Sequence, residues 1–203
     1  MKRAHIFLPA FLLVLLISSC KKDEDISGLP SDCVNVTGWL VNGHKWVYDH
    51  YSPYIFADSL TVEITSVSSN TFTLMSTYDD GFFYPSYSSY LHPCGNDLYS
   101  SRSASMTDPF IAYKIDGTVG ETWSYTGKTE LGYTASVDNE ITGKNVSVTV
   151  DAGTFSCIKI HTILNSSQPG SETVITDFYI NNDYGIIKVD GNTTDYSLRW
   201  KNF

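Results

Sequence analysis

The chain has 203 residues and a formal net charge of −9. Aromatic residues make up 14% of it, and 14 of them are tyrosines. Its length suits a single domain with a sizeable core, and its negative charge disfavours nucleic acid, whose phosphates it would repel. Abundant aromatic, Ser and Thr residues, without long helix-forming stretches, indicate a β-sheet protein. We therefore predict one all-β domain with no nucleic-acid partner.

The first element is a secretory signal. Lys2 and Arg3 precede an apolar run at positions 6–17. A helix that spans a membrane needs about 20 apolar residues, so this run is too short to be a permanent anchor. Small residues, Ser18-Ser19, follow the run and stand directly before Cys20. We predict that residues 1–19 are a signal peptide that is removed.

The stretch Ile17-Ser18-Ser19-Cys20 resembles the lipobox of bacterial lipoproteins. This resemblance implies that the Cys20 thiol carries a diacylglycerol, and two or three acyl chains attach a protein durably to a membrane. The following Lys21-Lys22-Asp23-Glu24-Asp25 resembles the surface-export signal of Bacteroidetes lipoproteins. We predict an outer-membrane lipoprotein exposed at the cell surface, with a periplasm-facing orientation as the alternative.

A tether and a single domain follow the lipidated cysteine. Residues 20–32 are mostly polar and are predicted to be flexible, whereas residues 33–203 form the all-β domain. Outside the cytoplasm, the remaining thiols of Cys33, Cys94 and Cys157 permit one disulfide and one free cysteine. A bridge between Cys33 and Cys94 would fix the start of the domain, although spacing alone leaves the pairing open.

Alternating apolar and polar residues predict strands within the domain. The pattern is clear at positions 60–65, 145–150 and 196–201. One apolar and one polar face is typical of antiparallel sheets. Turn signals such as Asp79-Asp80-Gly81 and Asp151-Ala152-Gly153 separate the strands. The spacing predicts a meander that closes into a barrel or a β-sandwich.

Three motifs in the second half carry a family resemblance: Gly117 to Tyr125, Val148 to Ile160, and Tyr184 to Val189. Their order resembles that of a broad bacterial envelope family of uncharacterised function, similar to the lipoprotein-carrier group. The resemblance implies a curled antiparallel sheet that forms a half-open barrel with an apolar inner face. It supplies no catalytic residues. Asp151 also departs from the family pattern, which has Pro there.

No catalytic or metal-binding motif stands out in the sequence. Its histidines lack the convergent spacing of a zinc site, so we predict no metal and no cofactor. The leading hypothesis is a non-enzymatic envelope protein that binds a glycan, an apolar ligand or another envelope protein outside the cytoplasm. A carrier of an apolar or lipid ligand is the first alternative. A glycan hydrolase is the second, with Asp79-Asp80 or Asp177 and Asp183 as conceivable acid pairs.

The tyrosine-rich segment at positions 78–99 is the candidate binding surface. Exposed aromatic side chains stack on sugars and anchor protein partners, although cross-strand tyrosines can also simply stiffen a hairpin. Asp58-Ser59-Leu60 resembles the short O-glycosylation motif of exported Bacteroidetes proteins, which makes Ser59 a candidate modification site. The predicted patch consists of Tyr78, Phe82, Phe83, Tyr84, Tyr87 and Tyr90.

Overall fold

A computed structural model describes residues 18–19, 29, 33, 35, 37–53, 57–79, 86–101, 103, 105–106, 109–128 and 132–203. The predicted lipidation site Cys20 lies outside this part of the chain, as do Phe82, Phe83 and Tyr84 of the predicted patch. Among the described residues there is no helix with the length and apolar character needed to cross a membrane.

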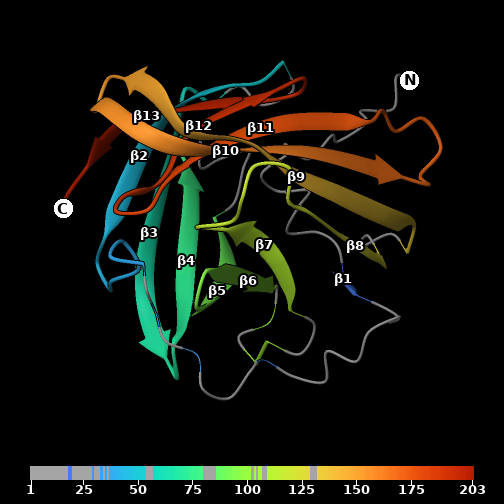
Figure 1. Ribbon diagram of the computed structural model, residues 1–203, viewed down its shortest axis with the longest axis horizontal. Helices are drawn as coiled ribbons and strands as arrows, with labels where there is room; N and C mark the ends of the chain where they lie inside the picture. The colour runs from blue at the N-terminus through green and yellow to red at the C-terminus, as the bar shows by residue number, and fades with distance from the viewer. Residues whose placement is uncertain are drawn as a thin grey trace.

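Every regular element in the described residues is a strand, which confirms the all-β prediction (Figure 1). The strands are β1 (Ser18–Ser19), β2 (Lys45–Tyr51), β3 (Ser59–Ser68), β4 (Thr71–Tyr78), β5 (Tyr87–Cys94), β6 (Asp97–Ser101), β7 (Phe110–Lys114), β8 (Thr122–Lys128), β9 (Thr134–Val150), β10 (Gly153–Ser166), β11 (Val174–Asn181), β12 (Gly185–Gly191) and β13 (Asp195–Lys201).

The strands form one antiparallel sheet in the order β1-β8-β9-β10-β11-β12-β13-β2-β3-β4-β5-β6-β7. In Figure 1, β9 to β11 run across the direction of β2 to β4, because the sheet curls round on itself. β7, at one end of this order, comes to face β8, which lies next to β1 at the other end, across a seam. The predicted curled, half-open barrel is confirmed.

Alternating burial along the strands explains how the sequence forms this barrel. In β4, every second side chain from Phe72 to Tyr78 is buried. The predicted strands at 60–65, 145–150 and 196–201 lie within β3, β9 and β13. Because side chains on a strand point alternately to opposite faces, one set fills the barrel and the other faces outward. The core includes fully buried Phe178 and Ile160.

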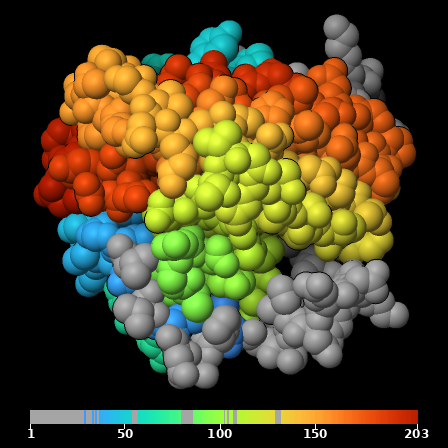
Figure 2. All heavy atoms as spheres, in the orientation of Figure 1, coloured from blue at the N-terminus to red at the C-terminus, as the bar shows by residue number. Residues whose placement is uncertain are grey.

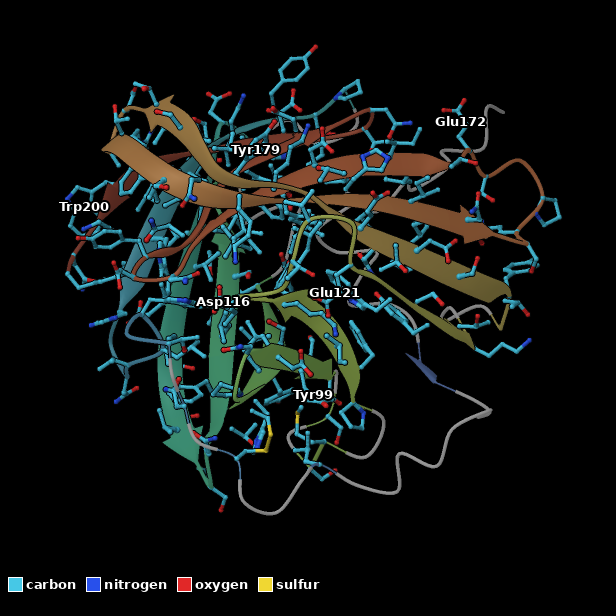
Figure 3. All side chains as sticks on the ribbon, in the orientation of Figure 1. Tyr99, Asp116, Glu121, Glu172, Tyr179 and Trp200 are labelled. Carbon is cyan, nitrogen blue, oxygen red and sulfur yellow. A yellow bond between two sulfur atoms is a disulfide. The ribbon has the colours of Figure 1, made fainter. Side chains whose placement is uncertain are left out.

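Side-chain contacts bridge the seam between β7 and β8, where the described residues form no backbone ladder. The Trp123 Nε1 donates a hydrogen bond to the Ile111 carbonyl at 3.0 Å. The Lys114 Nζ pairs with Glu121 Oε1 at 2.7 Å, and Figure 3 shows Glu121 beside this junction. In Figure 2 the lime to yellow segment that carries β7 and β8 joins the green and orange halves of the molecule. The barrel is therefore nearly closed, with one unsealed seam.

Replacing Trp123 by phenylalanine is expected to loosen the seam. The variant keeps an aromatic ring but loses the donor to the Ile111 carbonyl, so we expect it to cost about 0.5–1.5 kcal/mol. Hydrogen exchange should accelerate in β7 and β8. The control is Trp200→Phe, since Trp200 is 49% exposed and should change stability by less than about 0.5 kcal/mol. Unchanged protection of both seam strands in Trp123→Phe would contradict this account.

A disulfide joins Cys33 to Cys94, across 61 positions of the sequence. It attaches the start of the domain to the end of β5, next to a bridge between Asn35 and Gly95. This is the pairing that spacing alone left open. Cys157 is free and buried in the core, and burial raises the pKa of its thiol to about 11. Cys157 is therefore a small core residue and not a reactive thiol.

Removing the disulfide by the double change Cys33→Ser and Cys94→Ser is expected to lower the free energy of unfolding by about 2–4 kcal/mol. The bridge closes a long loop, so its loss increases the conformational freedom of the unfolded chain. Urea denaturation under oxidising conditions measures the change. Adding reductant should lower the stability of the natural protein to that of the variant. A natural protein insensitive to reductant would show that the bridge is not formed.

Candidate functional site

Side chains largely fill the inside of the barrel. Among the described residues of the interior lies a cavity of about 50 Å³, lined by Trp39, Trp46, Tyr48, Leu74 and Ile186 among others. By this measure one water molecule needs about 10–15 Å³, so the space suits a few water molecules and is too small for an acyl chain. The filled interior therefore counts against the prediction of a lipid carrier.

The three described residues of the predicted aromatic patch, Tyr78, Tyr87 and Tyr90, do not form one exposed surface. Tyr78 is only 3% exposed, and its hydroxyl lies 3.0 Å from that of Tyr196 inside the barrel. The prediction that Tyr78 is a surface anchor is wrong, because Tyr78 continues the buried face of β4. The Tyr87 ring also packs against the core, and burial raises its pKa. Tyr90 pairs with Thr73 on the opposite, outer face of the sheet.

The candidate glycosylation site and the histidines do not form a common site with the aromatic residues. Ser59 begins β3 on the outer face and is half-buried beside exposed Asp58, so its glycosylation stays a prediction. The buried His50 uses Nδ1 to donate to the Ala57 carbonyl at 2.8 Å, and desolvation lowers its pKa. Within the part of the chain that is described, no three metal-ligating side chains come together.

A hollow lies on the outer face of the sheet, across β8, β9 and β10. It has a volume of about 390 Å³. Cross-strand pairing builds it from two rows. Thr122, Glu140 and His161 form one row, and Ser124, Asp138 and Ile163 form the next. We call this hollow the outer groove; it is lined by Thr122, Trp123, Ser124, Asp138, Asn139, Glu140, His161 and Ile163.

The imidazole of His161 is held in place from the neighbouring strand. Its Nδ1 lies 2.8 Å from Asp177 Oδ1, and Asp177 Oδ2 pairs with Lys159 Nζ at 2.8 Å. Burial would raise the pKa of Asp177, but the hydrogen bonds from Lys159 and His161 lower it overall. The carboxylate can only accept, so Nδ1 carries the proton. In the neutral ring, Nε2 is then an acceptor available to a ligand.

Asp138 and Glu140 add two carboxylates to the groove. They lie two residues apart on β9, so both project from the same face of one strand. Glycoside hydrolysis needs two carboxyl groups that flank the scissile bond. A ligand lying on the sheet would meet both of these from the same side. The conceivable pair of Asp177 and Asp183 offers no better cleft, because Asp177 is ion-paired mid-strand and Asp183 lies in the next turn.

Comparisons with known proteins identify the fold. No protein-family model matches the chain, and no curated protein matches it. Among solved structures, a candidate exported protein with a YmcC-like fold from Bacteroides fragilis is similar, with a TM-score of 0.58 and 12% identity over 83% of this chain and 99% of that one. A candidate lipoprotein from Parabacteroides distasonis has a TM-score of 0.53 and 11% identity over 83% and 100%. At these identities the likeness shows the fold alone.

Proposed function

We propose that this protein is a lipid-anchored envelope protein that binds a polar ligand in the outer groove. The lipobox-like stretch before Cys20 supports attachment to the outer membrane, and the charged residues behind it support exposure at the cell surface. The two structural neighbours are described as an exported protein and a lipoprotein, which agrees with an envelope location.

The observation that carries the proposal is the contrast between the two hollows. The outer groove, at about 390 Å³, is lined mostly by polar residues, His161 among them, whereas the interior cavity of about 50 Å³ is lined mainly by apolar side chains. Ligand sites combine adequate volume with a few fixed polar groups. The outer groove has both properties, and the interior lacks the volume.

Binding fits the groove better than hydrolysis does. Its two carboxylates project from the same face of β9. The hydroxyl groups of Thr122 and Ser124 lie on β8, and the imidazole of His161 lies on β10, with β9 between them. A nucleophile must lie within hydrogen-bond reach of its base, whereas strands two apart are separated by about 9–10 Å. The protein is therefore proposed to hold its ligand without transforming it.

The test is an NMR screen of the lipidated, ¹⁵N-labelled protein in detergent micelles against sugars, amines and short fatty acids. We expect ligand-induced shifts to concentrate in β8 to β11. These shifts should disappear in Ser124→Trp, where the indole fills the groove. The matched control is Ser147→Trp, which places the same ring on an exposed outer position of β9 beyond the groove. Shifts that map to the barrel interior, or that survive Ser124→Trp, would contradict the proposal.

A further inference from the structure

Among the described residues, the carboxylates of the groove differ from neighbouring acids on the outer face in having no cationic partner. Asp177 pairs with Lys159, and Asp190 pairs with Lys188 at 2.8 Å. Asp49, further round the sheet, pairs with Arg199 at 3.0 Å. In contrast, neither Asp138 nor Glu140 has an ion-pair partner among the residues that the structure describes, and no Lys or Arg lines the groove.

An apolar track leads away from these two carboxylates. Asp138 pairs across the sheet with Ile163, which lines the groove, and Ile163 pairs in turn with Ile175. Ile175 is 42% exposed, so two isoleucines lie side by side on the outer face. A ligand that covered them would remove apolar surface from water, which favours binding by about 25 cal/mol per Å².

The imidazole of His161 completes the set of ligand contacts. With Nδ1 held by Asp177, the neutral ring presents Nε2 as an acceptor. The groove therefore offers two carboxylates and one nitrogen acceptor, with hydroxyl groups beside them. A primary ammonium group has three N–H donors and one positive charge, which matches this set.

We propose that the outer groove binds a primary ammonium group carried on an aliphatic stem. The ammonium would lie against Asp138, Glu140 and His161, and the stem would lie along Ile163 and Ile175. This inference rests on the proposed function and names the ligand class for the same groove. A free alkylamine and the side chain of a lysine in a partner protein share this chemistry.

The experiment titrates the lipidated protein with alkylammonium ions from methyl to butyl and follows groove amides by NMR. We expect affinity to rise up to about fourfold for each added methylene, as expected for buried CH₂ groups. The double change Asp138→Asn and Glu140→Gln should weaken butylammonium binding at least tenfold. Ile175→Thr should leave methylammonium binding unchanged and reduce the gain from a longer stem.

The charge-matched control is the double change Glu172→Gln and Asp183→Asn. Both side chains are exposed, and Figure 3 shows Glu172 near the start of β11. Butylammonium affinity should stay within twofold in this control. An equal loss in both double variants would show general charge attraction and overturn the inference. Butanol binding as tightly as butylammonium would overturn it as well.

Two further measurements identify the natural source of the ammonium group. They also separate failure of this inference from failure of the proposed function. A Gly/Ser peptide with one central lysine should bind, and its acetylated form should not, if the natural source is a protein; binding of free amines alone points to a small molecule. Either result supports the ammonium class. If amines fail while other compounds of the screen shift groove residues, the class is wrong but the groove still binds. If nothing shifts the groove, the proposed function fails too.

Discussion

Replacing Cys20 by serine is expected to abolish the proposed acylation of the protein and, with it, the proposed attachment to the outer membrane. Only a thiol at this position accepts the thioether-linked diacylglycerol that the lipobox resemblance implies, and two or more acyl chains are needed for durable attachment. Labelled palmitate supplied to growing cells should enter the natural protein and not the variant. The loss should be complete, because Cys20 is the residue to which the lipobox resemblance assigns the lipid.

The control for this prediction is Cys157→Ala, which removes a cysteine that is buried in the core. Its labelling should equal that of the natural protein. Equal incorporation of palmitate into the Cys20→Ser variant would show that the anchor lies elsewhere. An unlabelled natural protein would show that the chain is exported without lipid.

Replacing Phe178 by alanine is expected to lower the free energy of unfolding by about 3–5 kcal/mol. Phe178 is 1% exposed, and its ring meets Tyr113 at a centroid distance of 5.4 Å. These residues belong to β11 and β7, so the contact joins strands far apart in the sheet order across the barrel interior. Truncation leaves a cavity that the curled sheet cannot collapse to fill.

The matched control is Ile175→Ala on the same strand. Ile175 faces outward and is 42% exposed, so we expect a cost below about 1 kcal/mol. Urea denaturation of both variants, followed by tryptophan fluorescence, gives the comparison. Equal losses would contradict the assignment of inner and outer faces to β11.

Much of the fold follows from local patterns in the sequence. The alternation at 60–65 identifies both the strand and its buried face, because side chains on a strand alternate with a period of two. The same rule, applied along β4, places Tyr78 with Phe72 and Leu74 in the core. The prediction of Tyr78 as a surface anchor followed the local density of aromatic residues and overlooked this alternation.

The outer groove could not be predicted from local patterns. Glu140, His161 and Asp177 come from three strands, and they meet only through the pairing of β9, β10 and β11. An irregularity between Cys157 and Ile160 shifts that register, and no local signal marks it. The pairing of the cysteines could not be predicted either, because their spacing along the chain does not show which cysteines approach each other.

The central claim is that the ligand binds on the outside of the barrel and not within it. Two isoleucine methyl groups report on these places in one ¹H–¹³C spectrum, since Ile163 lines the outer groove and Ile186 lines the interior cavity. Titration of the lipidated protein with butylammonium should shift the Ile163 methyl resonance in a saturable manner and leave Ile186 unchanged. A saturable shift of Ile186 with Ile163 unmoved would contradict the account.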